Sequence, residues 1–325
     1  MEQKFGIVIA SHISNIKRIY YLVECLQSLI DQTLPCNIYL SISFETCHLK
    51  HVFINILNDD PFLKTTLLKV FIREQKTPQM RHIQSVLSEL ETDKIDWIMF
   101  CDDDDTYEEN RVSIFYNRIQ ACLKEIAEKY PTKCLAGAYE STFGKHHEEQ
   151  RHEFWCYCIS FKVLNDFYRK IYLQGTASII DPIIEHNCCD IIFGEYLRRL
   201  MHSELYMYSR ITEPYYNYRV EESDSITGII KVTQSTVWQP MIVNDEDVHV
   251  YVKLYNEYLE KNIHVYLHDT YLRTSIGNEI DEILKAELKR DYRFLDLIDK
   301  KHIDKIRDYH DSLKRVVKGI YGGAP

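Results

Sequence analysis

The chain has 325 residues, of which 45% are hydrophobic and 27% are charged, and its formal net charge is −10. This length and composition indicate an ordered globular protein with one large α/β domain or two ordinary domains, and they exclude a small disulfide-stapled scaffold. The acidic balance argues against a nucleic-acid partner, because affinity for a phosphate backbone comes mostly from clustered lysine and arginine.

Ten cysteines are scattered along the chain. The close pairs Cys156/Cys158 and Cys188/Cys189 are too near in sequence for ordinary pairing with each other, and no second half-site completes a zinc pattern. We therefore expect reduced thiols and a cytoplasmic location. No apolar run approaches the roughly twenty residues of a membrane span, so we expect no transmembrane segment.

The first hundred residues alternate apolar, strand-like runs with amphipathic helical stretches, which is the pattern of a parallel sheet covered by helices. Strands are expected at residues 4–10, 37–44, 67–72 and 96–101, and helices at residues 15–30, 51–57 and 80–90. A helix at residues 112–127 and strands at residues 134–139 and 154–161 follow.

After about residue 245 the strand signals fade, and residues 248–260 and 279–318 show mostly helical patterns with Glu/Lys-rich faces. The sequence therefore predicts an α/β domain over residues 1–240 and a mainly helical C-terminal appendage over residues 241–325.

Four consecutive aspartates, Asp102, Asp103, Asp104 and Asp105, directly follow the apolar strand expected at residues 96–101. Like charges this close raise one another's pKa, so the run is unfavourable unless something neutralises it. A divalent cation such as Mn²⁺ or Mg²⁺ would do so, because hard oxygen ligands suit these ions. Alternate residues of an extended backbone point the same way, so Asp102 and Asp104 could share one ion.

The alternative is a solvated acidic turn that caps the following helix, with Asp105 or Thr106 as N-cap. The position at the carboxyl end of a buried strand favours the cation site, since open α/β sheets bind their ligands there.

The order of these features resembles the nucleotide-binding half of the family 2 inverting glycosyltransferases. The matching segments are the first strand and helix, then residues 41–45 (SISFE), 76–82 (KTPQMRH), 98–105 (IMFCDDDD) and 215–227 (YYNYRVEESDSIT). The resemblance covers roughly residues 4 to 230. It implies a Rossmann-like GT-A fold, a nucleotide-sugar donor with UDP-sugars favoured, and transfer to a hydroxyl of a glycan or glycoconjugate acceptor.

Carried onto this sequence, the resemblance implies that Asp102 and Asp104 contact the metal and the donor. Asp105 is a further metal candidate and Asp103 a further donor contact. Arg81, in the place of the family's frequent arginine, would approach the donor diphosphate or hold the acidic loop, although it could equally be a surface helix cation.

Ala10, Ser11 and His12 follow the first strand, where the family has a nucleotide-contacting turn. Glu45 follows the second strand, where in the family an aspartate commonly binds the nucleobase of the donor. Both places depart from the usual residue types, which leaves the identity of the nucleobase open.

Inverting transfer needs a group that takes the proton from the acceptor hydroxyl. Asp190 is the best-placed candidate for this base, because it lies where the family has a Glu-Asp pair followed by a helix; Cys189 replaces the first acid of that pair. Asp190 could instead cap the helix, or do both. Glu185 and Glu195 are reserve candidates.

Several other groups of residues allow either a functional or a structural interpretation. The histidines His146, His147 and His152 fit a solvated surface loop better than a metal cluster. Acidic residues after the Tyr-Arg segment, namely Glu221, Glu222 and Asp224, could serve the metal. The tyrosines Tyr215, Tyr216 and Tyr218 could stack on sugars or bases, or pack in the core.

The strongest rival function is a phosphatase of the haloacid-dehalogenase class, in which Asp102 is the nucleophile and Asp104 the general acid. That motif normally follows the first strand of a chain, and no convincing Gly-Asp-x-x-x-Asp partner follows here. An EF-hand loop fails at its sixth and twelfth positions, which are Tyr107 and Ser113. A catalytically silent nucleotide-sugar binder stays open.

Overall fold

The computed structural model describes residues 3–140, 153–219, 248–288 and 296–322. The chain divides into two compact units, one of residues 1–219 with 318–325 and the other of residues 220–317. The predicted domain boundary at residue 240 lies outside the described residues, as do His146, His147, His152, Glu221, Glu222 and Asp224.

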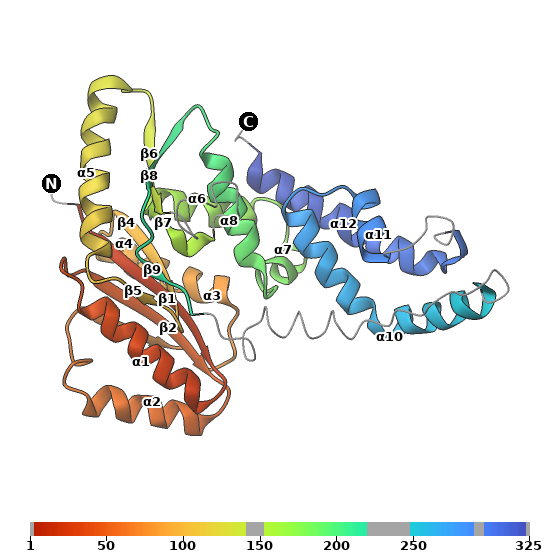
Figure 1. Ribbon diagram of the computed structural model, residues 1–325, viewed down its shortest axis with the longest axis horizontal. Helices are drawn as coiled ribbons and strands as arrows, with labels where there is room; N and C mark the ends of the chain where they lie inside the picture. The colour runs from red at the N-terminus through yellow and green to blue at the C-terminus, as the bar shows by residue number, and fades with distance from the viewer. Residues whose placement is uncertain (1–2, 141–152, 220–247, 289–295, 323–325) are drawn as a thin grey trace. The chain divides into compact units, whose positions relative to one another are not determined.

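A seven-stranded sheet forms the centre of the first unit (Figure 1). Its strands, in the order β3-β2-β1-β4-β7-β6-β8, are Leu68–Ile72, Asn37–Phe44, Phe5–Ile13, Trp97–Asp102, Tyr157–Ser160, Cys134–Glu140 and Tyr206–Ile211. Only β7 runs antiparallel to its neighbours within this sheet. Strands β1, β2 and β4 are buried along nearly their whole length, as expected of parallel strands covered on both faces.

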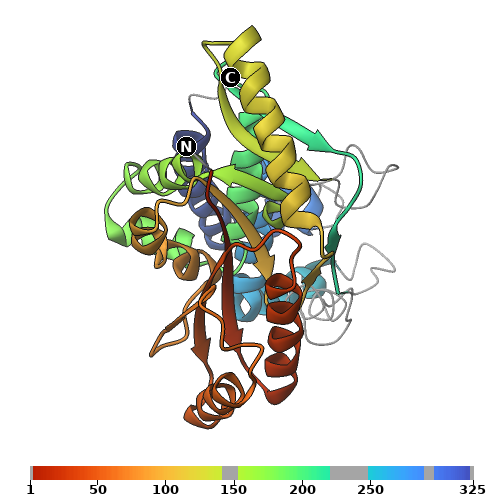
Figure 2. The same cartoon turned by 90° about the vertical axis from the view of Figure 1, so that its left-hand side faces the viewer.

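Helices cover both faces of this sheet (Figures 1 and 2). Helices α1 (Ile16–Ile30) and α5 (Arg111–Lys129) lie on one face, and α3 (Gln79–Gln84) and α6 (Phe161–Tyr172) lie on the other. The remaining helices of the unit are α2 (Cys47–Asp59), α4 (Leu87–Thr92), α7 (Ala177–Ile184) and α8 (Cys189–Leu200). This arrangement confirms the predicted fold class of a mostly parallel sheet flanked by helices.

The second unit contains α10 (Val248–Ser275), α11 (Ile280–Leu288) and most of α12 (Lys300–Tyr321), which confirms the helical C-terminal appendage. Its core is formed by buried tyrosine, leucine and isoleucine side chains, namely Tyr255, Leu259, Tyr266, Leu284, Ile298, Ile303 and Ile306. None of the helices in the described part of the chain is both long and apolar enough to span a bilayer.

Two local predictions are wrong in detail. The helix expected at residues 80–90 is two short helices, because the Ser85 hydroxyl donates to the carbonyl of His82 (2.7 Å) and Val86 leaves helical geometry. The strand expected at residues 154–161 begins with a turn of 3₁₀-helix at Phe154–Cys156, and Phe161 already belongs to α6. Strand β8 was not predicted; its side chains are only partly buried, so its apolar pattern is weak.

Strand order places the acidic run at a reversal point of the sheet. From β1 the chain passes to β2 and then β3 on one side, whereas β4 pairs with the other side of β1. The register sets Ala10 of β1 beside Asp102, the last residue of β4. Open α/β sheets bind ligands in the crevice at such a point, outside the carboxyl ends of the strands.

Candidate functional site

Asp102 ends β4 and starts a tight turn in which the Asp105 N–H donates to the Asp102 carbonyl (3.2 Å). Its carboxylate accepts a hydrogen bond from Gln79 Nε2 (3.0 Å), and its backbone N–H donates to the Tyr216 hydroxyl (2.9 Å). Burial and the charges of the neighbouring aspartates, Asp190 included, raise the pKa of Asp102 well above its ordinary value. In the absence of a cation, burial therefore disfavours the charged form of this carboxyl.

Arg18 neutralises the middle of the acidic run. Its guanidinium donates from Nη1 to Asp104 Oδ2 (2.7 Å) and from Nη2 to Asp103. Ala10, Ser11 and His12 lie within β1, which extends to Ile13, and not after the first strand as expected. Ser11 donates its hydroxyl to the other oxygen of Asp103 (2.5 Å). Burial raises the pKa of Asp103 to about 6, although Arg18 and Ser11 oppose this rise.

Both oxygens of Asp105 accept hydrogen bonds from a segment more than a hundred residues later. The Tyr216 hydroxyl donates to Oδ2 (2.8 Å), and the Arg219 N–H donates to Oδ1 (2.7 Å). Arg219 Nε also donates to the carbonyl of Asp104 (2.8 Å). Asp105 would bind a cation only by exchanging one of these contacts.

The side chains that pack around Tyr216 are buried. Its ring stacks on Trp155, with centroids 4.1 Å apart. Arg111 donates to the Trp155 carbonyl (2.8 Å) and forms an ion pair with Glu140 (2.6 Å). Glu140 in turn accepts the N–H of Tyr215 (2.5 Å). Because a buried charge is costly unless it is paired, Arg111 and Glu140 fix each other and the segment beside them.

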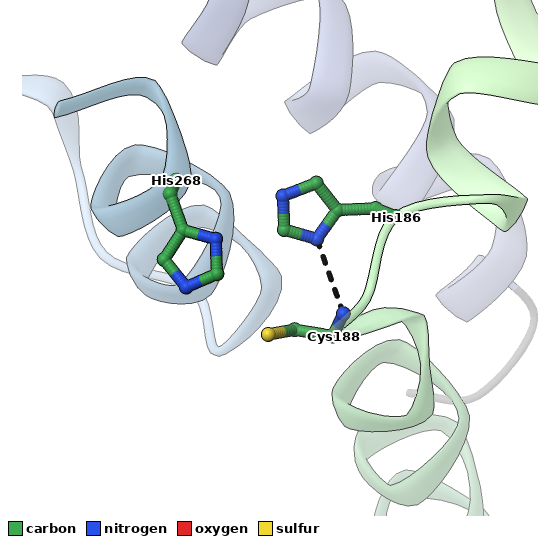
Figure 3. Close-up of side chains that lie close together, drawn as sticks. All are labelled: His186, Cys188 and His268. Carbon is green, nitrogen blue, oxygen red and sulfur yellow. Dashed lines mark hydrogen bonds between the residues drawn. The ribbon is translucent and has the colours of Figure 1, made fainter. Parts of the chain in front are cut away.

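Asp190 lies in the first turn of α8, and its charge is one of those that raise the pKa of Asp102. The start of this helix is fixed locally, since the N–H of its N-cap Cys188 donates to His186 Nδ1 (3.2 Å; Figure 3). Asp190 is thus a candidate catalytic base whose charge acts on Asp102.

The two reserve candidates for the catalytic base, Glu185 and Glu195, form hydrogen bonds with arginines. Glu195 accepts from Arg198 Nε (2.6 Å) and Arg199 Nε (2.7 Å) within its own helix. Glu185 accepts from Arg81 Nη2 (3.0 Å), which also contacts Asp181. Arg81 Nη1 also donates to Gln84 Oε1 (3.1 Å) at the end of α3 and to the Tyr172 hydroxyl at the end of α6. The contact of Arg81 with a donor diphosphate stays a prediction.

His12 and Glu45 lie together at the ends of β1 and β2, with His12 Nε2 2.9 Å from Glu45 Oε2. The other ring nitrogen of His12 lies 3.0 Å from the Ser43 hydroxyl, which lies 3.1 Å from Nε2 of buried His82. Burial and the nearby Arg73 charge lower the pKa of His82 to about 3, so His82 is neutral. His12 and Glu45, which are predicted to contact the nucleobase, therefore belong to one hydrogen-bonded polar group beside the acidic run.

The structure thus brings together Ala10, Ser11 and the four aspartates, with Asp190 near Asp102 and with His12 and Glu45 on the adjacent strand ends. Sequence reasoning missed Arg18 and Gln79 as partners of the aspartates and gave Arg219 no role. Arg18 carries a weak signal, because it stands in the first turn of the helix that directly follows β1.

The residues present fit a divalent cation. The extended backbone expected through Asp104 is wrong, because β4 ends at Asp102 and Asp103 and Asp104 form a turn. Asp102 and Asp104 nevertheless both offer hard carboxylate oxygens, which is the donor chemistry that Mg²⁺ and Mn²⁺ prefer. The raised pKa of Asp102 fits as well, because a bound cation would favour the charged carboxylate that burial disfavours.

Stability without metal should depend on pH through Asp105. Burial raises the pKa of Asp105 to about 7, above an unfolded value of about 3.9. The folded state therefore holds this proton more tightly, and the stabilisation present below about pH 4 is lost as the pH rises through about 7. We expect Asp105→Asn to remove this loss, because asparagine does not titrate. Its amide oxygen can accept only one of the two hydrogen bonds from Tyr216 and Arg219, so the variant should also lose some stability equally at every pH.

The measurement is the melting temperature of both proteins in a metal chelator between about pH 5 and about pH 8. The variant should gain on the wild type across this interval. Parallel curves for the two proteins would contradict the assignment of this titration to Asp105.

No protein-family model matches the chain, and no curated protein sequence matches it. Among solved structures it is similar to residues 1–349 of S. aureus TarS in complex with UDP, with 13% identity, 95% of this chain and 91% of that chain covered, and a TM-score of 0.46. The same protein in complex with UDP-GlcNAc gives 13% identity, coverages of 97% and 90%, and a TM-score of 0.44.

A cytidylyltransferase from Leptospira borgpetersenii serovar Hardjo-bovis is also similar, with 13% identity, coverages of 81% and 96%, and a TM-score of 0.40. Since all three TM-scores lie below 0.5, we infer nothing about the activity of this chain from these likenesses.

Proposed function

We propose that this chain is a divalent-cation-dependent, inverting glycosyltransferase of the GT-A kind. It moves a sugar from a nucleotide-sugar donor, a UDP-sugar by preference, to a hydroxyl of a glycan or glycoconjugate acceptor. The observation that supports the proposal is the position of Asp102 and Asp104 at the reversal point of a mostly parallel sheet, where the charge of Asp190 in α8 also acts on Asp102. The scattered cysteines fit a cytoplasmic location for this activity.

The residues of the candidate site have separate roles in the proposed reaction. Asp102 and Asp104 would hold Mn²⁺ or Mg²⁺, which supplies positive charge against the diphosphate as it leaves. Asp190 takes the proton from the attacking acceptor hydroxyl. Ser11 keeps Asp103 in place, so that the loop presents its carboxylates before the donor arrives.

His12 and Glu45, at the ends of the neighbouring strands β1 and β2, would contact the nucleobase of the donor. His82 contacts His12 through the Ser43 hydroxyl, and because His82 is neutral it adds no charge beside them. Glu45 is the charged member of the group, because His12 and Lys76 lower its pKa. Such a set of hydrogen-bonding side chains suits a nucleobase, whose edge offers both donors and acceptors.

A melting-temperature series with UDP tests the proposal, since a ligand that binds only the folded state stabilises it by mass action. With Mn²⁺ present, UDP at about a hundred times its Kd should add about 2.7 kcal/mol to the free energy of unfolding. The gain should vanish in a chelator and in Asp102→Ala and Asp104→Ala. Asp59→Asn, an exposed change on α2, is the matched control and should keep the full gain.

An equal UDP shift with and without metal would count against the proposed mechanism. The rival phosphatase makes a different prediction, because it would hydrolyse a simple aryl phosphate with no nucleotide sugar present. The position of the acidic run on β4, the fourth strand along the chain, favours the transferase over that rival.

A further inference from the structure

Arg18 occupies a defined place at the acidic run. Its backbone N–H is held by the side chain of Asn15, the N-cap of α1 (3.2 Å). Its guanidinium then reaches across to Asp103 and Asp104, and its side chain is only 20% exposed. The positive charge is therefore set in position among the carboxylates by both its backbone and its two partners.

The two partners of Arg18 differ in how they are held. Asp103 also accepts the Ser11 hydroxyl and is almost fully buried, with its carboxylate 6% exposed. The Asp104 carboxylate is 26% exposed, and Arg18 is its recorded hydrogen-bond partner among the described residues. Asp104 can thus exchange its partner more easily than Asp103 can.

A cation held by Asp104 would meet the guanidinium at close range. A guanidinium and a divalent cation about 4 Å apart repel each other by about 2 kcal/mol in water and by more near a protein surface. The atom that Arg18 contacts, Asp104 Oδ2, is one of the two carboxylate oxygens through which Asp104 could bind a metal. Arg18 and a divalent cation therefore compete for the negative charge of this carboxylate.

We propose that Arg18 takes the place of the cation in the metal-free protein, and that entry of the cation at Asp104 releases its guanidinium to bind the donor diphosphate. This inference rests on the proposed function. A diphosphate approaching a chain of net charge −10 needs local positive charge. A released guanidinium suits this need, because its planar fork matches phosphate oxygens. Metal binding would then precede donor binding.

The test is Arg18→Gln, measured with two ligands. Affinity for Mn²⁺ alone, from the electron paramagnetic resonance signal of free Mn²⁺, should rise by about tenfold because a competitor is gone. Affinity for UDP at saturating Mn²⁺ should fall by about tenfold or more, because charge-assisted hydrogen bonds to phosphate are lost. A purely structural arginine would not move the two affinities in opposite directions.

Arg169→Gln is the matched control, since it removes an exposed arginine that pairs with Asp166 elsewhere, and it should change neither affinity. An unchanged or weaker Mn²⁺ affinity in Arg18→Gln, or an unchanged UDP affinity, would overturn the inference while the wild type still binds Mn²⁺ and the proposed function stands. Absence of Mn²⁺ binding in the wild type would remove the proposed function and the inference together.

A second test measures the accessibility of Arg18 in the wild-type protein and needs no variant. Phenylglyoxal modifies accessible guanidinium groups, and the modified arginine can be located by peptide mass spectrometry. Adding Mg²⁺ should increase modification at Arg18 relative to a chelator, and UDP added with Mg²⁺ should decrease it again. Equal modification of Arg18 in all three conditions would overturn the proposal.

Discussion

Asp190→Asn should lower kcat for sugar transfer by about 10²- to 10⁴-fold while leaving the affinity for UDP nearly unchanged. Asparagine has the same shape but cannot take a proton from the acceptor hydroxyl. The donor site should survive, because Asp190 lies on α8, whereas the diphosphate is assigned to the loop after β4. Steady-state transfer rates and UDP binding, measured on the same preparation, provide the two readings.

Glu185→Gln and Glu195→Gln are the matched controls, because both carboxylates hold arginines in or beside the same region. They should keep most of the activity. Full transfer by Asp190→Asn would exclude Asp190 as the base. A wild type that binds UDP with Mn²⁺ but transfers no sugar from any donor would support the non-catalytic binder instead.

Asp104→Asn should lower kcat/KM by on the order of 10³-fold, because the charge on the leaving diphosphate loses its stabilisation. An amide oxygen is a poorer ligand than a carboxylate, so the loss should be mainly one of metal affinity. The dependence of the rate on Mn²⁺ concentration, compared with that of the wild type, measures this directly.

Raising the Mn²⁺ concentration should therefore restore part of the activity of Asp104→Asn. Asp59→Asn again serves as the control, because it removes an exposed aspartate of another surface. If Asp104→Asn transferred sugar at the wild-type rate in a chelator, Asp104 would have no part in holding a metal.

The sheet and the place of the acidic run were predictable because both depend on local patterns. The strand ending at Asp102 is an uninterrupted apolar run, and a parallel strand of that kind ends where open sheets bind ligands. The stripe of apolar residues on α1 and its cap at Asn15 are equally local. Such features need no knowledge of distant residues.

The partners of the aspartates were not predictable in the same way. Arg18 lies 86 positions from Asp104, and Arg219 lies 114 positions from Asp105. Only the folded sheet brings them together, and a lone arginine on a helix carries no pattern that points to its partner. The antiparallel direction of β7 likewise depends on pairing between strands and is invisible to periodicity.

The late position of Tyr216 and Arg219 in the chain has a consequence for the order in which the first unit folds during synthesis. Strands β1 to β4 are complete by residue 102, yet Asp105 receives its two hydrogen bonds from Tyr216 and Arg219. The buried pair of Arg111 and Glu140 supports this same late segment through Tyr215. Synthesis from the ribosome therefore yields the sheet centre long before a finished acidic loop. A nascent chain that stops short of Tyr216 would present four aspartates without this support, so competence to bind a cation should be among the last properties the first unit gains.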